Sequence, residues 1–215
     1  MNSNRRQPVV AILVVLLMGQ TLPARAQELY AVPLRNPSFA EGVDQHGVPL
    51  GWSRYGSGGK EQKLHVTRED DGHTSLLISD GDRNTEIGVT QTVALKGGDT
   101  YEAAVKVRAV EGTASSGAYL QLRFLPSNQY TQTGLATESA GRYSEVSVIA
   151  TAPPDTTQAT IYLYTHREPR LQIVVTDVRL TGGHPAPPPP PPPPPAPVPP
   201  QYETLKDLHV EIPLV

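Results

Sequence analysis

Apolar and polar residues alternate with a period of two along most of the central part of the chain. The clearest case is residues 92–110, where two such runs are joined by Gly97 and Gly98. In the second run, every other residue from Tyr101 to Ala109 is apolar, and most residues between them are polar. Successive side chains of a strand point to opposite faces, so each run predicts a strand with one buried face and one wet face. The two glycines supply the positive φ angles that a tight connection between these strands needs.

Similar runs recur at short, regular intervals along the chain. We expect strands at residues 64–68, 75–79, 118–125, 143–150, 158–164 and 171–180, separated by Gly, Pro, Asn and Asp. No stretch between these runs repeats apolar residues at helical spacing over three turns. Eight or more short strands with such connections are typical of a two-sheet antiparallel sandwich. The sequence therefore predicts an all-β fold of the jelly-roll type.

Two large side chains, Phe39 and Trp52, precede the regular runs and are expected to be the first anchors of the core. A single tryptophan could also serve as a platform for a sugar ring. However, a tryptophan flanked by strand and turn signals usually packs inside the protein. We therefore favour a structural role for Trp52.

The first 26 residues have the pattern of a secretory signal peptide. Arg5 and Arg6 precede an apolar run of ten residues, and residues 24–26 read Ala-Arg-Ala. The run is too short for a membrane span, which needs about 20 apolar residues. No cysteine follows that could anchor a lipoprotein. We expect cleavage before Gln27 and export of a product without a membrane segment, to the periplasm, the cell surface or the medium.

The composition of the chain divides the exported part into three segments. We expect the sandwich domain to occupy residues 27–183 and a polyproline linker to occupy residues 184–200, because 13 of the 16 residues from 185 to 200 are proline. Such a tract forms an extended, stiff helix and would span roughly 50 Å. The last segment, residues 201–215, is too short to bury a core. It is either an interaction tail or the start of a second domain of catalytic type, and we favour the second.

Charge and cysteine content exclude several classes of protein. The 215 residues carry a formal net charge of -3, and no basic cluster lies beyond the first few residues, so nucleic acid is not an expected partner. Without cysteine there is no disulfide framework and no thiolate site. Stability must therefore come from burial.

The order of several short motifs resembles that of carbohydrate-binding modules of the family 4 and 9 type. The matching pieces are residues 36–42 (NPSFAEG) followed by 51–52 (GW), 91–95 (QTVAL), 98–101 (GDTY), 141–146 (GRYSEV), 153–154 (PP) and 175–180 (VTDVRL). This resemblance implies a jelly roll that binds glycans without catalysis, often as an accessory to a glycoside hydrolase.

The resemblance also implies a structural calcium ion. Members of the family often hold it with a carboxylate just after the conserved Phe and another near the closing strand. Here Phe39 is followed by Ala40, and Thr176 stands where an acidic residue is common. Glu41 and Asp177 lie next to these positions and are the candidate ligands, although calcium prefers six or more oxygens. No other cofactor is expected.

Strand alternation selects a candidate sugar-binding face. The side chains that oppose the apolar ones in residues 118–125 and 158–164 include tyrosines, an amide and a guanidinium, and Tyr130 follows on a loop where it could form a rim. Sugars present apolar ring faces edged with hydroxyls, and aromatic rings beside such donors suit both features. The candidate carbohydrate-binding residues are Tyr119, Gln121, Arg123, Tyr162, Tyr164 and Tyr130. The alternative is that the strand tyrosines only satisfy β propensity.

Other candidate chemistry is weaker. Asp80 opens a stretch that begins like a calcium loop, but Thr85 stands where such a loop needs Gly and Gln91 where it needs Glu, so a polar hairpin loop is favoured. Several carboxylates could in principle supply a glycosidase pair, but acidic residues in strand connections are usually solvated. These carboxylates are Asp70, Asp71, Asp80, Asp82 and Glu86. No catalytic residue is therefore assigned.

These features together predict a secreted, non-catalytic module that attaches to polysaccharide. The alternative from a different class is a structural or protein-interaction β-sandwich of the cell surface with no sugar ligand.

Overall fold

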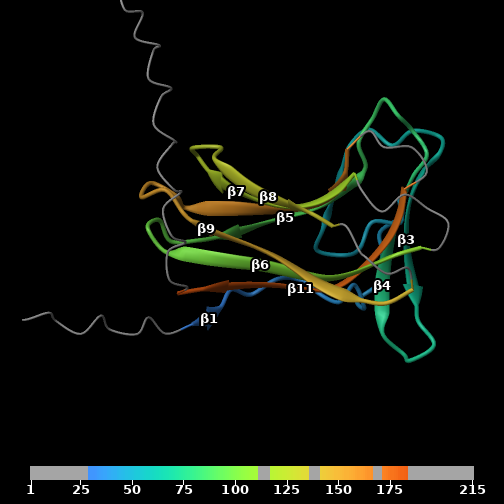
Figure 1. The fold of residues 1–215 in the computed structure, drawn as a ribbon, viewed down its shortest axis with the longest axis horizontal. Coiled ribbons are helices and arrows are strands. Elements are labelled where there is room, and N and C mark those ends of the chain that lie inside the picture. Colours follow the sequence, from blue (N-terminus) through green and yellow to red (C-terminus); the bar gives the residue numbers. More distant parts are fainter. Residues whose placement is uncertain (1–28, 111–116, 136–140, 167–170, 184–215) are drawn as a thin grey trace, which may run out of the picture.

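The structure, a computed structural model, describes residues 29–110, 117–135, 141–166 and 171–183. Every regular element in these residues is a β-strand, and the strands form two antiparallel sheets. The predicted all-β sandwich is therefore confirmed. Figure 1 shows one layer above the other, with β5, β7 and β8 in the upper layer and β6 and β11 in the lower one. The predicted signal peptide, polyproline linker and C-terminal tail lie outside the described residues.

The larger sheet has six strands. Its order is β3-β4-β11-β6-β9, and the short β1 also pairs with β11. The bounds are β1 Tyr30–Ala31, β3 Gln62–Arg68, β4 Thr74–Asp80, β6 Thr100–Ala109, β9 Ser144–Thr151 and β11 Leu171–Gly182. Because Tyr30 lies opposite Gly182, the chain enters and leaves the described domain side by side on this sheet.

The smaller sheet has five strands in the order β2-β5-β10-β7-β8. Its strands are β2 Ser53–Tyr55, β5 Gly88–Ala94, β7 Ala118–Leu125, β8 Tyr130–Gly134 and β10 Gln158–Thr165. The central strand β10 pairs with β5 on one side and with β7 on the other. Two of the runs singled out in the sequence, 118–125 and 158–164, are thus direct neighbours.

The core lies between the sheets and is built from the apolar side of each alternating run. On β6, the five alternate residues from Tyr101 to Ala109 are all buried, as the period of two predicts. The inward residues of β7 and β10 are buried in the same way: Ala118, Leu120, Leu122, Phe124, Ala159, Ile161 and Leu163. Burial of these side chains is the main favourable contribution to the stability of this cysteine-free domain.

The segment before β2 is fixed to the sandwich by buried rings and amides. Phe39 and Trp52 are both buried with their ring centroids 5.5 Å apart, so the predicted packing of Trp52 is confirmed. The Trp52 indole N–H donates to the carbonyl oxygen of Asn36 at 3.1 Å. From β5, the buried Gln91 amide accepts from the Arg35 N–H at 2.8 Å and donates to its carbonyl at 2.9 Å. Main-chain groups outside the sheets thereby obtain partners inside the protein.

Residues 92–110 do not form the tight hairpin that the sequence predicts. β5 belongs to the five-stranded sheet and β6 to the six-stranded sheet, so residues 95–99 cross from one layer to the other. Of the two glycines in this crossing, only Gly98 has a positive φ, of 84°. Gly97 is needed for a different reason, because a Cβ atom there would lie 2.2 Å from the carbonyl oxygen of Pro154. The Gly-Gly pair therefore combines one conformational and one steric requirement.

In the part of the chain that the structure describes, there is no helix long and apolar enough to cross a membrane.

The two glycines of this crossing should respond differently to substitution. Gly97→Ala should lower the free energy of unfolding by about 1–3 kcal/mol, because the added methyl group meets backbone. Gly98→Ala should lower it by about 1–2 kcal/mol, because alanine is disfavoured at positive φ. Urea denaturation of each purified variant measures these changes.

Asparagine distinguishes the two causes, since it tolerates positive φ better than alanine but is larger. A Cβ atom at Gly98 would have no other atom within 4 Å, so only the positive φ matters there. Gly98→Asn should therefore destabilise the domain less than Gly98→Ala. Gly97→Asn should be at least as destabilising as Gly97→Ala. The same ranking of alanine and asparagine at both positions would contradict this account.

Candidate functional site

The predicted sugar-face residues come together on the outer face of the five-stranded sheet. In the pairing of β10 with β7, Tyr162 lies opposite Gln121 and Tyr164 lies opposite Tyr119. Paired residues of an antiparallel ladder point to the same face, so all four project away from the core. Arg123 follows on the same side of β7.

Tyr130 is not on a loop, as expected, but is the first residue of β8. It pairs directly with Arg123, so it belongs to the same face as the other candidates. Every residue of β8 except Thr133 is exposed, so the strand carries no buried apolar side. Alternation could not reveal a strand of this kind, because its backbone pairing rather than its burial defines it.

A hollow of about 450 Å³ lies on this face and includes five of the six predicted residues. Four further lining residues were not predicted for the sugar-binding face: Tyr55, Glu86, Gln132 and His166. His166 continues the alternation of Tyr164, so a longer reading of the same pattern would have found it, whereas Gln132 required the pairing of β8 with β7. Tyr55 required the order of the strands, since β2 reaches this face only through its pairing with β5.

The tyrosines of this face form one connected cluster of rings. Tyr55 lies 5.3 Å from both Tyr162 and Tyr164 between ring centroids, and Tyr119 lies 5.7 Å from Tyr164. Gly88 makes room for the cluster, because it pairs with both Tyr55 and Tyr164 and a Cβ atom there would lie 2.7 Å from the Tyr164 Cβ.

Burial divides these rings into a base and a surface. Tyr164 is only 8% exposed, which differs from the expectation of a projecting ring, because Tyr55 and Tyr119 pack against it. Tyr119 and Tyr162 are partly exposed, and Tyr130 is 55% exposed. Tyr164 therefore supports the face, and the other rings present it to solvent.

Arg123 is held between aromatic rings. Its guanidinium carbon lies 5.0 Å from the centroid of Tyr162 and 5.5 Å from that of Tyr130, distances typical of cation–π interactions. The Gln121 amide, turned so that its oxygen faces Arg123, accepts from the Nε and Nη2 of Arg123 at 3.1 Å each. Within the residues that the structure describes, no carboxylate forms an ion pair with Arg123.

The amides continue this network across β8. In the same orientation, the nitrogen of the Gln121 side chain donates to Gln132 Oε1 at 3.2 Å. The Tyr164 hydroxyl donates to the same oxygen at 3.1 Å. Arg123, Gln121, Gln132 and Tyr164 are thus linked by hydrogen bonds, and each orients the next.

The opposite end of the hollow is organised by Glu86. Its Oε2 accepts from the Tyr55 hydroxyl at 2.6 Å, and its Oε1 lies 2.7 Å from His166 Nδ1. Burial, together with the hydrogen bond to Glu86 and its negative charge, raises the pKa of Tyr55 to about 12. Burial and the charge of Glu86 also raise the pKa of Tyr164. Both phenols are therefore neutral donors at physiological pH.

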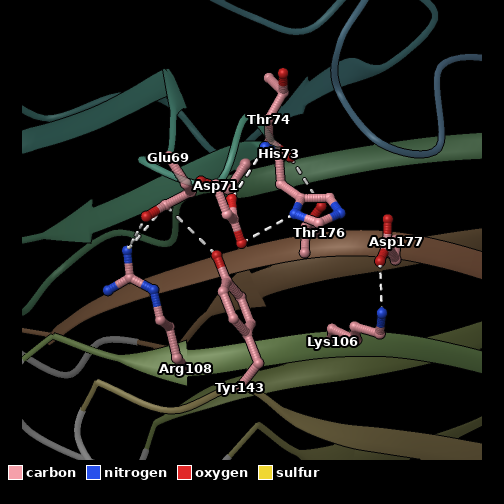
Figure 2. Close-up of polar contacts among 10 residues, drawn as sticks. Glu69, Asp71, His73, Thr74, Lys106, Arg108, Tyr143, Thr176 and Asp177 are labelled. Atoms are coloured by element: carbon pink, nitrogen blue, oxygen red, sulfur yellow. Dashed lines mark hydrogen bonds and ion pairs between the residues drawn. The ribbon is translucent and has the colours of Figure 1, made fainter.

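A second polar cluster lies on the outer face of the six-stranded sheet, where a hollow of about 280 Å³ is found. Figure 2 shows Arg108 directed at Glu69, with Tyr143 beside them, and Lys106 directed at Asp177. The Arg108 guanidinium also lies 5.4 Å from the centroid of the Tyr143 ring. The two sheets thus each carry an arginine over a tyrosine, but Arg108 has a carboxylate partner.

The side chains present do not fit the calcium site that the family resemblance implies. Asp177 Oδ2 accepts from Lys106 Nζ at 2.8 Å, so the lysine ammonium already balances the charge of this carboxylate. Glu41 is exposed, and Ala40 and Thr176 supply no carboxylate. Across residues 29–183, leaving out the undescribed gaps, no group of three or more His, Cys, Asp or Glu side chains could hold a metal ion.

Three of the acidic candidates show no paired arrangement, because Asp80 is hydrogen-bonded within the protein and Asp71 and Glu86 line different hollows. Asp80 is buried and accepts from Gln62 Nε2 at 3.0 Å and from the Thr165 hydroxyl at 2.5 Å. Asp71 lines the hollow of the six-stranded sheet, whereas Glu86 lines that of the five-stranded sheet. These two carboxylates therefore do not face a common site.

Comparison with known proteins places the chain among sugar-binding domains. A family model described as a carbohydrate binding domain, CBM_4_9, matches residues 34–170. No curated protein sequence matches the chain.

Solved structures share the fold at low sequence identity. Tailspike protein 4 of bacteriophage CBA120 is 14% identical, with a TM-score of 0.53 over 70% of this chain and 21% of that chain. The Stig cyclase Fisc from Fischerella sp. TAU is 15% identical, with a TM-score of 0.52 over 74% and 100%. TmCBM61, solved with β-1,4-galactotriose, is 14% identical, with a TM-score of 0.50 over 70% and 98%. The chain spans about a fifth of the tailspike chain, and these likenesses show the fold alone.

Removal of calcium should leave the stability of the domain unchanged. The melting temperature of the purified protein, measured by calorimetry, is expected to be the same in EDTA and in excess calcium chloride, because Lys106 already pairs with Asp177. Lys106→Met, which frees this carboxylate, provides the comparison. A rise in the melting temperature of the unaltered protein on adding calcium, reversed by EDTA, would contradict this interpretation.

Tyr55 should make stability depend on alkaline pH. Its pKa is raised from about 10 in the unfolded chain to about 12 in the fold. The stabilisation is therefore fully present below pH 10 and is lost as the pH rises through 12. The difference in unfolding free energy between the unaltered protein and Tyr55→Phe, measured with urea, should shrink over this range.

Glu86→Gln tests the cause of this shift. Removing the negative charge beside Tyr55 should move the loss of stability to lower pH, because this charge adds to burial and the hydrogen bond in raising the pKa. A difference between the unaltered protein and Tyr55→Phe that stays constant from pH 9 to 12 would argue against the assignment.

Proposed function

The chain belongs to the CBM_4_9 family of carbohydrate binding domains, and we propose that it attaches to polysaccharide through the outer face of its five-stranded sheet. The observation that carries this proposal is the cluster of partly exposed tyrosines beside a guanidinium and two amides. Aromatic rings pack against the apolar faces of pyranose rings, and the polar groups bond the hydroxyls at their edges.

The face is largely ordered before any sugar binds. The network from Arg123 to Tyr164 fixes the polar groups, and the packing of Tyr55 against Tyr162 and Tyr164 fixes the rings. Binding to groups that are already oriented loses less side-chain entropy than binding to mobile ones. This preorganisation supports a role in ligand binding beyond that of ordinary strand residues.

The same face supports binding rather than hydrolysis. Glycoside hydrolysis needs two carboxyl groups on either side of the scissile bond. Of the described residues that line the hollow, Glu86 is the single carboxylate, and it contacts Tyr55 and His166. The fold alone does not distinguish a binding domain from an enzyme, because a cyclase has the same fold. We therefore assign a non-catalytic role on the groups present.

Export and an accessory role complete the proposal. The pattern of residues 1–26 supports export, and the proline tract supports a spacer that joins the domain to a neighbouring glycoside hydrolase. The described chain enters and leaves on the six-stranded sheet, where Tyr30 pairs with Gly182. A tether attached there leaves the opposite sheet free to contact polysaccharide.

Truncation of an exposed ring should weaken binding without unfolding the domain. Tyr162→Ala and Arg123→Ala are each expected to reduce retention in polysaccharide-containing gels by about tenfold or more, as central interface residues do. Affinity electrophoresis measures retention, and calorimetry of the same samples should show little change in melting temperature.

The matched control comes from the other sheet. Tyr143→Ala removes a ring that also lies under an arginine, and it should leave retention unchanged. Equal loss of retention in Tyr143→Ala and Tyr162→Ala would place the binding surface elsewhere. A glycan array on which the unaltered domain binds no sugar would instead favour a structural or protein-interaction sandwich.

A further inference from the structure

We infer that this face selects polysaccharides that carry carboxylates, such as those rich in uronic acids, and that Arg123 is the group that recognises them. The inference rests on the proposed function and names the class of sugar that the face takes.

Arg123 is positioned as a binding group before a ligand arrives. The rings of Tyr162 and Tyr130 lie 5.0 and 5.5 Å from its guanidinium carbon, and Gln121 holds its Nε and Nη2 at 3.1 Å. A guanidinium has five N–H groups, and the Gln121 oxygen accepts from those on the edge formed by Nε and Nη2. The edge formed by the two terminal nitrogens remains for a ligand. This planar fork matches the two oxygens of a carboxylate.

Two other arginines, the partly buried Arg108 and the exposed Arg179, show what this guanidinium lacks. Arg108 on β6 pairs with Glu69 at 2.9 Å, and Arg179 on β11 pairs with Glu145 through both nitrogens of its fork. Arg123 is also partly buried, yet no carboxylate in the described ranges lies within ion-pair distance of it. Its counter-charge is therefore absent from the surrounding sheet.

The acid that shares the hollow does not supply this counter-charge. Glu86 lines the other side, where its oxygens contact Tyr55 and His166. A neutral sugar laid over Arg123 would remove water from an unpaired cation, which is unfavourable. A uronate would bring the missing anion to the same place, and charge-assisted hydrogen bonds are stronger than neutral ones. This difference is the source of the selectivity.

Carboxyl reduction of a polymer tests the inference directly. The full chain is run through gels that contain polygalacturonate or glucuronoxylan, and through gels that contain the same polymers after their carboxyls are reduced to alcohols. Reduction should weaken retention by about tenfold or more, because a charge-assisted hydrogen bond is lost. Added salt should weaken retention on the charged polymers more than on the reduced ones.

Variants assign the effect to one side chain. Arg123→Gln keeps hydrogen-bonding groups but removes the charge. Gels with the charged polymer and gels with the reduced polymer should therefore retain this variant equally. Arg108→Gln, on the other sheet, should keep the preference for the charged polymers. Arg123→Lys keeps the charge without the planar fork, so it should bind uronate polymers with intermediate strength. The melting temperature of each sample identifies any variant that is unfolded.

Three outcomes would overturn the inference. If gels with charged and with reduced polymers retain the unaltered chain equally, uronate selectivity is rejected and the proposed function still stands. A preference for charged polymers that survives Arg123→Gln but not Arg108→Gln rejects Arg123 as the recognising group. No retention by any charged or neutral polymer rejects the proposed function and the inference with it.

Discussion

The pairing of β10 with β7 is the interaction on which both the core and the candidate site depend. Eight residue pairs fix this register, from Gln158 with Leu125 to Thr165 with Ala118. The pairs that contain Ile161 and Leu163 point inward, and those that contain Tyr162 and Tyr164 point outward. A slip of one residue would move both sets to the wrong face. Hydrophobic burial on one side of the sheet therefore holds the tyrosines in place on the other.

Local alternation predicted much of this arrangement from sequence. It identified the all-β fold, the inward residues of β6, β7 and β10, and the outward residues of β7 and β10 that the structure brings together. It did not reveal that residues 92–110 cross between sheets, because hairpins and crossings share the same turn residues. It also did not reveal Tyr55 on this face or β8, whose places depend on which strands are neighbours. Such pairings are long-range and leave no periodic trace in the strand itself.

Burial of Tyr164 shows the same limit for a single side chain. Alternation places this ring on the outer face correctly, but only 8% of it is exposed. Gly88 on the neighbouring strand has no side chain, so Tyr55 can reach over it and contact Tyr164. Whether an outward residue is exposed thus depends on the size of residues far away in the sequence. Exposure on a sheet is a property of pairs of strands rather than of one strand.

The two arginine–tyrosine contacts differ in how the charge of the arginine is balanced. On the six-stranded sheet, Arg108 lies over Tyr143 and is neutralised by Glu69, to which Tyr143 and Ser75 also donate hydrogen bonds. This cluster is complete within the protein. On the five-stranded sheet, Arg123 has the same kind of aromatic contact but is oriented by the neutral Gln121. A neutral partner fixes the geometry of a cation without cancelling its charge, so the field of Arg123 stays directed at the hollow and at whatever binds there.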